Sequence, residues 1–378
     1  MPDRHDILRI SGTDWAEMTT RLMTYADVGE MLRKKAEILH KEPRKMRIAL
    51  KPNLISCTPA MYGATTHPEL LDAAVRYILA AGFPAPVIME GSWVGDRTAD
   101  AFEYCGYNAL AAQYGLTLID TQKEPGIPVD CSGIQLNICR CALEADFLIN
   151  FPVLKGHCQT KVTCALKNMK GLIPNSEKRR FHTMGLHKPI AHLNTILKPD
   201  LIITDHICGD PDFEEGGNPL IRNSILLSTD PVLTDAYAAS LLGYRPEEIG
   251  YIRFAADLGV GCMDLRTMRL TDMNSPVIAD ILPETRRLME VSYPADAVDS
   301  CSACYGMLIG ALRTLRDEGL LDRLPCRVCI GQGYRGKSGP YGIGNCTRGF
   351  DRFIPGCPPD ESTILRELRQ WICDSEQT

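Results

Sequence analysis

Residues 46–90, MRIALKPNLISCTPAMYGATTHPELLDAAVRYILAAGFPAPVIME, decide the fold class of this chain. The β-rich run at 46–55 ends in a Pro-Asn turn, and residues 67–82 carry apolar side chains at helical spacing. That segment has a proline in its first turn and a glycine at its end, as helices often do, and a short apolar run follows at 85–90. This order predicts a strand, a helix and a second strand, which is typical of a β–α–β unit.

The same alternation continues along the chain. We predict further elements as helices at 98–115, 188–197 and 231–244 and as strands at 116–121, 145–154, 200–209 and 223–230. Repeated alternation of this kind indicates an α/β protein with a layered, mostly parallel sheet. In such sheets the carboxyl ends of the strands carry the functional site.

The composition bounds the domain organisation. At roughly 100–200 residues per domain, 378 residues suit about two domains. Glycine, proline and cysteine become denser near residue 294, where a smaller C-terminal β/α module begins. We therefore expect a helical N-terminal extension at 1–44, an α/β domain at 45–293 and a Gly/Cys-rich module at 294–378.

Charge and hydropathy exclude some function classes. The net charge of −6 gives no electrostatic reason to bind nucleic acid or an anionic membrane. The first residues lack a signal-peptide pattern, and no apolar run is long enough to cross a membrane. We expect a cytoplasmic protein, in which sixteen cysteines point to metal or redox chemistry rather than disulfides and are typical of an anaerobic host.

Four cysteines near the C-terminus form the strongest motif. Cys301 and Cys304 are a Cys-x-x-Cys pair at the start of a predicted helix, whose dipole favours negative sulfur. Cys346 and Cys357 lie in Gly-rich turns, where small residues allow backbone N–H groups to approach cluster sulfurs. These four residues are our predicted ligands of a 4Fe–4S cluster.

A second Cys-x-x-Cys pair, Cys326 and Cys329, is a weaker candidate. It reads as part of a strand, and residues three apart on a strand face opposite sides and converge poorly. Structural zinc would use both Cys-x-x-Cys pairs but would leave Cys346 and Cys357 without a role. A redox disulfide pair is the other alternative.

Residues 154–192 concentrate basic and histidine side chains in an acidic protein. The candidates in this segment are Lys155, His157, Lys167, Asn168, Lys170, His182, His187 and His192. One interpretation is an anion pocket for a carboxylate or phosphate, with lysines as charges and Asn168 as an orienting amide. Others are a metal site built from histidine nitrogens, or a solvated loop.

Polar residues at the predicted strands complete the candidate site. Lys51, Asn53 and His67 follow the first strand, and Asp205 and His206 lie in the strand at 200–209. We expect these five residues and Asn168 to bind substrate, and Lys155, His157, Lys167 and Lys170 to be catalytic.

Several of these stretches resemble the domain-of-unknown-function family 362. The matching segments are KPNLI (51–55), TTHPELLDAAVRYI (65–78), LKGHCQTKVTCALKNMKGLIP (154–174), DLIITDHICGD (200–210) and LLSTDPVLTDAYAASLLG (226–243). The resemblance covers roughly residues 45–290 and implies an iron–sulfur cluster-binding protein, without fixing a reaction. The tandem ferredoxin module common in that family is absent from this sequence.

The C-terminal loops resemble a second group of proteins. GNC at 344–346 and IPGCPPD at 354–360 are similar to cluster loops of nickel–iron hydrogenase small subunits and of the related quinone-reductase subunit. In those proteins a flavodoxin-like domain holds a 4Fe–4S cluster. The adjacent Cys-Cys pair of the quinone-reductase subunit is missing here, so neither activity carries over.

Three functional hypotheses follow. The first is an iron–sulfur oxidoreductase that relays electrons from a ferredoxin or flavodoxin to a small anionic molecule in the α/β domain. The second is a non-catalytic electron-transfer partner. The third is a metal-dependent isomerase or lyase acting on a carboxylate, with a structural cluster. The sequence leaves the substrate, the oligomeric state and the participation of a flavin open.

Overall fold

The computed structural model describes residues 2–274 and 287–376, which form two compact units. Unit 1 contains residues 2–180 and 187–274, and unit 2 contains residues 181–186 and 287–376. The boundary between the two units thus lies close to the change in composition near residue 294.

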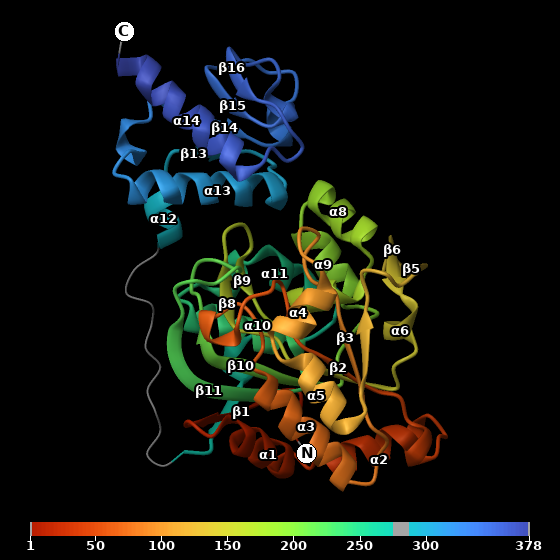
Figure 1. Cartoon of the computed structure of the whole chain (residues 1–378). Coiled ribbons are helices and arrows are strands. Elements are labelled where there is room, and N and C mark those ends of the chain that lie inside the picture. The colour runs from red at the N-terminus through yellow and green to blue at the C-terminus, as the bar shows by residue number, and fades with distance from the viewer. Residues whose placement is uncertain (1, 275–286, 377–378) are drawn as a thin grey trace. The chain divides into compact units, whose positions relative to one another are not determined.

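An eight-stranded sheet forms the centre of unit 1 (Figure 1). Neighbouring strands run parallel except at β11, which is antiparallel to both β1 and β10. The prediction of an α/β fold with a mostly parallel sheet is confirmed. In spatial order the strands are β12 (Arg269–Asp272), β1 (Asp6–Ser11), β11 (Leu220–Ser228), β10 (Leu201–Gly209), β7 (Phe147–Asn150), β2 (Ile48–Lys51), β3 (Val87–Glu90) and β4 (Thr117–Asp120).

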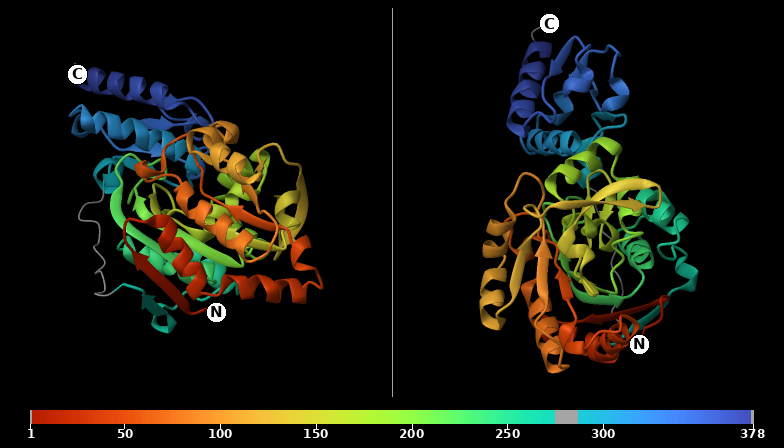
Figure 2. Two further views of the ribbon diagram at one scale, coloured as in Figure 1. Left: turned by 60° about the horizontal axis from the view of Figure 1, so that its bottom comes forward. Right: turned by 90° about the vertical axis from the view of Figure 1, so that its right-hand side faces the viewer.

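Helices cover both faces of this sheet, as the right-hand view of Figure 2 shows. Leu8 and Ile10 of β1 pack into the core with helices α1 to α5, whereas Arg9 faces the other way and contacts Tyr237 on α10. The described helices of unit 1 are α1 (Trp15–Tyr25), α2 (Val28–Ile38), α3 (Pro68–Ala80), α4 (Thr98–Tyr104), α5 (Tyr107–Tyr114), α6 (Arg140–Leu143), α7 (Ala165–Asn168), α9 (His187–Leu193), α10 (Pro231–Leu241) and α11 (Gly250–Asp257). Helix α8 (Asn175–Met184) begins in unit 1, and its last four residues belong to unit 2.

The helix predicted at 98–115 is two helices. Gly106 adopts a left-handed backbone with φ of 82°, which ends α4 and starts α5. Such a conformation is cheap for glycine and costly for other residues, so it separates two short helices without a proline.

The N-terminal 44 residues differ from the expected helical extension. They contain α1 and α2, but also β1, whose residues 7–11 pair with β11. Residues 1–44 were expected to stand apart; those described belong instead to unit 1, with β1 inside its sheet. The strand is short and precedes a strongly helical pattern, so the helical periodicity masked it.

Two hairpins were also not predicted. β5 (Gly126–Cys131) pairs with β6 (Ile134–Cys139), and β8 (Lys155–His157) pairs with β9 (Lys161–Thr163). The second hairpin lies in the basic segment that the sequence described only as polar, and it places Lys155 and His157 two residues apart on one short strand.

Unit 2 contains a four-stranded parallel sheet in chain order. Its strands are β13 (Ala295–Ala297), β14 (Val328–Ile330), β15 (Tyr341–Ile343) and β16 (Arg352–Ile354). The helices are α12 (Arg287–Ser292), α13 (Ser302–Asp317) and α14 (Glu361–Glu376), and α13 packs against α14. Asp360 accepts the backbone N–H of Thr363 at 2.8 Å and thereby caps α14.

Short 3₁₀ turns connect several elements. They are η1 (Pro43–Lys45), η2 (Ala60–Tyr62), η3 (Met169–Leu172), η4 (Pro246–Glu248), η5 (Leu265–Thr267), η6 (Leu321–Arg323), η7 (Gln332–Tyr334) and η8 (Asn345–Thr347). Of these, η3 continues α7 and carries part of the candidate site. Within the described residues, no helix combines the length and the apolar character that crossing a membrane requires.

Candidate functional site

Three neighbouring parallel strands of unit 1 end in polar residues. β7, β2 and β3 end at Asn150, Lys51 and Glu90. Lys51 Nζ lies 2.8 Å from Glu90 Oε1 and donates to the Pro52 carbonyl at 2.7 Å. Both charged side chains are buried, and burial lowers the pKa of Lys51 while the Glu90 carboxylate opposes that shift. Because an unpaired buried charge is costly, each group depends on the other.

Asn168 joins this pair to two further amides. Its Nδ2 donates to Asn150 Oδ1 at 2.7 Å, and its Oδ1 accepts from Asn53 Nδ2 at 3.0 Å. Asn168 Oδ1 also lies 3.4 Å from Lys51 Nζ. The carbonyl oxygen Asn53 Oδ1 is buried and accepts no hydrogen bond from the described residues. The structure therefore brings Lys51, Asn53 and Asn168 together at one edge of the sheet.

A carboxylate on α10 holds the start of α7, the helix that presents Lys167 and Asn168. Asp235 accepts the backbone N–H groups of Ala165 at 2.6 Å and of Leu166 at 3.2 Å. Burial raises the pKa of Asp235 to about 7, although these two N–H groups oppose the shift. Two sequence segments far apart in the chain thus depend on each other for the position of the basic side chains.

Glu214, in the loop between β10 and β11, lies at the centre of the predicted catalytic residues. Its Oε1 lies 3.1 Å from His157 Nε2, and its Oε2 lies 2.5 Å from Lys167 Nζ. Lys155 Nζ donates to the backbone carbonyls of Glu214, at 2.9 Å, and of Ala64. Burial opposes ionisation of Glu214, but His157 and Lys167 hold the pKa of its carboxyl well below the usual value. Glu214 thus contacts three predicted residues, two through its carboxylate and Lys155 through its backbone carbonyl.

The hydrogen bonds of His157 define its protonation. Its Nδ1 accepts the backbone N–H groups of Gln159 at 3.0 Å and Thr160 at 3.1 Å. Burial lowers the pKa of His157 to about 4, so the ring is neutral at pH 7 and has a single N–H. That proton is on Nε2 and is donated to Glu214. Both nitrogens are occupied, and a metal ion at Nε2 would have to displace the proton.

The other histidines of the region do not converge. His187 Nδ1 accepts the N–H of Tyr251 at 3.1 Å, and His192 Nδ1 lies 2.8 Å from the Cys131 carbonyl oxygen. Burial lowers the pKa of His206 to about 3, and His182 belongs to unit 2. In the part of the chain that the structure describes, no three His, Cys, Asp or Glu side chains are placed to hold a metal ion.

His67 and Asp205 form a separate buried pair. Asp205 Oδ2 lies 2.8 Å from His67 Nδ1 and accepts the backbone N–H of His67 at 2.8 Å. Burial disfavours the imidazolium, but the Asp205 carboxylate outweighs it and raises the pKa of His67 to about 10. Because His67 directly precedes α3, this pair ties the start of that helix to β10.

Two further lysines of this region, Lys170 and Lys178, form no ion pair with a described carboxylate. The Lys170 ammonium group, on η3, forms no hydrogen bond or ion pair with any described residue, and burial together with Lys167 lowers the pKa of Lys170 to about 7. Lys178 donates to the carbonyls of Gly91 and Ser92 at 2.9 and 2.8 Å, and burial lowers its pKa to about 8. A nearby anion would favour the charged form of both lysines.

Replacing Lys170 by methionine should stabilise the protein at pH 7. The folded pKa lies below the unfolded value of about 10.5, so charging Lys170 opposes folding below pH 7 and the penalty disappears as the pH rises towards 10.5. We expect a gain of about 1–2 kcal/mol in the free energy of unfolding at pH 7 and none at pH 10.5, measured by urea denaturation.

Lys167→Met is the matched control. Because Lys167 pairs with Glu214, its loss should cost about 3 kcal/mol at pH 7. If Lys170→Met destabilises the protein as much as Lys167→Met does, the ammonium of Lys170 has a stabilising partner and the interpretation is wrong.

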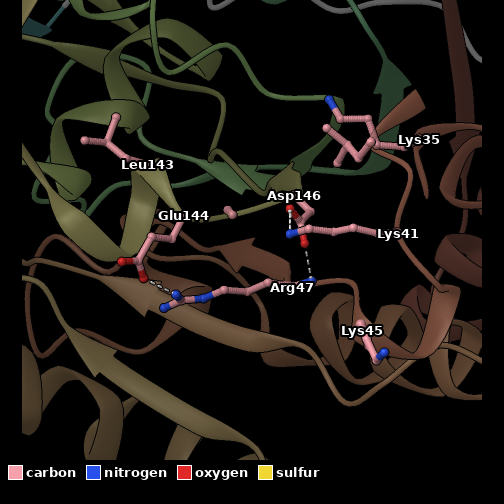
Figure 3. A pocket seen from close by; sticks show the side chains of 9 residues that line it. Lys35, Lys41, Lys45, Arg47, Leu143, Glu144 and Asp146 are labelled. Atoms are coloured by element: carbon pink, nitrogen blue, oxygen red, sulfur yellow. Dashed lines mark hydrogen bonds and ion pairs between the residues drawn. The ribbon is translucent and has the colours of Figure 1, made fainter. Parts of the chain in front are cut away.

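A surface cavity of about 690 Å³ lies at the opposite edge of the sheet, where β2 and β7 begin (Figure 3). Its basic side chains are already paired with carboxylates. Lys41 Nζ lies 2.6 Å from Asp146 Oδ1, and Arg47 pairs with Glu144. Because Lys41 and Arg47 already form ion pairs, they offer no unpaired ammonium group comparable to that of Lys170 near Glu214.

In unit 2, the four predicted cluster cysteines follow the carboxyl ends of parallel strands. Cys301 and Cys304 lie where α13 begins after β13, Cys346 lies in η8 after β15, and Cys357 follows β16. The thiol of Cys304 hydrogen-bonds Cys301, and this bond, opposed by burial, lowers the pKa of Cys301 to about 6. Cys346 and Cys357 are close enough to raise the pKa of Cys304 further.

Backbone contacts join the Cys346 and Cys357 loops. Asn345 donates its N–H to the Gly356 carbonyl at 2.9 Å, and the Arg335 side chain hydrogen-bonds the sulfur of Cys346. Cys326 precedes β14, at the amino end of that strand, and Cys329 lies within it. This placement separates Cys326 from the edge at which the other loops meet.

The fold and this site define an α/β protein with buried basic residues at the carboxyl ends of its strands. The chain belongs to the family described as Domain of unknown function (DUF362), whose profile matches residues 48–240. All the unit 1 residues named at the Glu214 site fall within this match, and the cluster cysteines fall outside it.

Two individual proteins show similarity to this chain. A thylakoid-associated protein of Synechocystis sp. is 26% identical over 180 residues, which cover 46% of this chain and 54% of that protein. The chain thus spans about half the length of this curated relative. The lactate racemase apoprotein of Thermoanaerobacterium thermosaccharolyticum aligns with a TM-score of 0.35 and 15% identity, over 68% of this chain and 58% of that one.

Sequence reasoning missed four polar partners of the site, three of them carboxylates. Glu90 and Asn150 lie in predicted strands, and the signal that marked Lys51, a polar residue at the end of an apolar run, was present for both. Glu214 and Asp235 lie in segments with no chemical motif, and only their contacts reveal them.

Proposed function

We propose that this chain is an iron–sulfur oxidoreductase whose unit 2 holds a 4Fe–4S cluster and whose unit 1 binds a small anionic substrate. The observation that carries the proposal is the placement of Cys301, Cys304, Cys346 and Cys357 at one edge of a parallel sheet. When bound, such a cluster exchanges one electron at a time, and we expect a carrier of the ferredoxin or flavodoxin class as partner.

The residues at this edge fit a cluster in chemistry. They supply four thiols, one of them at the start of a sixteen-residue helix, and the positive side chain of Arg335 beside Cys346. Gly344 passes close to Cys304, since a Cβ built on it would lie 3.7 Å from the sulfur. The support for the cluster is that these loops and their thiols lie at the same edge of the sheet. Among the described residues, the thiols are not placed as closely as bound metal ligands would be.

Unit 1 supports the anionic substrate. Lys167 and His157 already hold a carboxylate, that of Glu214, and Lys170 has no carboxylate partner among the described residues. In this proposal the lysines bind and orient the substrate through charge, and Asn168 fixes the position of the segment that carries them.

Anaerobic purification followed by iron and sulfide analysis tests this function. We expect a brown protein with about four irons and four sulfides per chain and a paramagnetic signal after reduction. A colourless protein with one zinc per chain would overturn the proposal. A reducible cluster without any anion binding would favour the non-catalytic electron-transfer partner.

A second candidate function has its own supporting observation. Burial lowers the pKa of Lys155 and of Lys170 to about 7, close to the value that suits a general base at neutral pH. This favours an isomerase or lyase acting on a carboxylate, in which the cluster is structural. Cys301→Ser would then lose iron yet keep turnover in unit 1, whereas the oxidoreductase would lose both.

A further inference from the structure

Glu214 lies in the loop at 210–219, whose two ends are joined by hydrogen bonds to Asp210. Asp210 Oδ1 accepts the N–H groups of Asp212 and Phe213 at 2.9 and 3.0 Å, and Asp210 Oδ2 accepts that of Asn218 at 3.0 Å. One carboxylate thus closes the loop on itself, and residues 214–217 form its tip.

The tip of this loop contains two adjacent glycines. Gly216 and Gly217 both have positive φ, 76° and 108°, which glycine adopts at little cost. The tip is held by the Glu214 side chain and by two backbone hydrogen bonds, from the Gly217 N–H to the Tyr62 carbonyl at 2.9 Å and from the Gly216 N–H to the Phe213 carbonyl at 3.3 Å. The Glu214 side chain is 19% exposed, whereas those of His157 and Lys167 are 2% and 7% exposed. Glu214 therefore lies on the solvent side of the groups that it binds.

The contacts of Glu214 are those that a bound carboxylate would make. One oxygen accepts from a neutral imidazole N–H, and the other accepts from an ammonium group. Each donor is held from behind by the fold. His157 is fixed by two backbone N–H groups, and Lys167 extends from α7, which Asp235 caps. The fold thus fixes the two donors, His157 and Lys167, whereas the acceptor, Glu214, lies on a loop tip.

We propose that Glu214 is an internal substitute for the ligand, and that a small dicarboxylate displaces it from His157 and Lys167 and opens the loop tip. This inference rests on the proposed anion site and names its substrate class. A carboxylate is chosen because Glu214 is one. A second carboxylate is chosen because Lys170 has no carboxylate partner among the described residues, and the charge of Lys167 and Glu214 acts on it directly.

Glu214→Gln removes the charge of the substitute with little change in shape. Malonate binds only the protein whose loop tip is open, so its apparent affinity is the intrinsic affinity multiplied by the open fraction. A variant that weakens the closed state should therefore bind malonate more tightly. In calorimetric titrations with malonate we expect the variant to bind at least tenfold more tightly than the wild type. Glu215→Gln removes a neighbouring charge that acts on Lys155 and Lys167 without an ion pair to either, so it should raise malonate affinity by a smaller factor than Glu214→Gln does.

Glu214→Asp is a second test of the proposal in case Glu214→Gln does not fold. It keeps the charge, but its shorter side chain cannot reach both donors, so it should also bind malonate more tightly, by a smaller factor. Acetate should bind at least tenfold more weakly than malonate to Glu214→Gln, because it offers nothing to Lys170.

The outcomes separate this inference from the proposed function. If the wild type and both Glu214 variants bind none of malonate, acetate and phosphate, the anion site itself is wrong. If the wild type binds malonate and neither variant binds it more tightly, the substitute role of Glu214 is wrong and the site stands. If acetate equals malonate in Glu214→Gln, the dicarboxylate class is overturned.

Discussion

Replacing Cys357 by serine should reduce the iron of anaerobically purified protein from about four atoms per chain to fewer than about one. The proposed cluster needs four thiolates, and Cys357 is the ligand expected from the loop that follows β16. A serine hydroxyl remains protonated at neutral pH and is a poor ligand for iron in such clusters. Iron and sulfide analysis, with the visible absorption of the cluster, measures the result.

Cys326→Ser is the matched control for Cys357→Ser. Cys326 lies before β14, at the amino end of that strand, so its loss should leave the iron unchanged. Cys301→Ser should behave as Cys357→Ser does. Full iron in both of those variants would contradict the ligand assignment, and a loss in Cys326→Ser equal to theirs would favour a site built on the two Cys-x-x-Cys pairs.

The second large effect is expected at Gly171, which lies against the buried Lys51–Glu90 pair. A Cβ on Gly171 would overlap Glu90 Oε1 and would lie 2.5 Å from Lys51 Nζ. Neither partner can move easily, because Lys51 also binds the Pro52 carbonyl and Glu90 accepts the N–H of Leu54 at 2.8 Å. We expect Gly171→Ala to lower the free energy of unfolding by about 3 kcal/mol, measured by urea denaturation.

Gly29→Ala is the control for a glycine without such a neighbour. A Cβ at Gly29, in α2, would meet atoms no closer than 3.6 Å, and alanine is the better helix former. It should therefore leave stability unchanged or raise it by about 0.5–1 kcal/mol. Equal stability of Gly171→Ala and the wild type would mean that the buried pair rearranges without cost.

Much of the fold could be predicted because its patterns are local. The helix predicted at 67–82 is α3, and the strand predicted at 85–90 contains β3, since apolar periodicity and end residues are enough to specify such elements. β1 and the β8–β9 hairpin were not predicted. They are short, and pairing with strands distant in sequence defines β1.

The candidate site was predictable in its basic half. Lysines, asparagines and histidines near strand ends stand out in the sequence, and the parallel sheet brings many of them to one edge. Its acidic half was not predictable, because Glu214 and Asp235 become informative only when a donor is found within hydrogen-bond distance. The histidines looked like one cluster in sequence, and their separate partners show that they are not.

The sequence by itself determined the alternation that makes an α/β sheet and the cysteine loops on which the cluster proposal stands. These features depend on the period of apolar residues and on residue types a few positions apart, which the chain carries in its order. Only the tertiary structure decided which charges are paired. Lys51 and Lys167 meet carboxylates far along the chain, while Lys170 meets none among the described residues. Burial makes that difference large, because a charge removed from water is stabilised only by the group beside it.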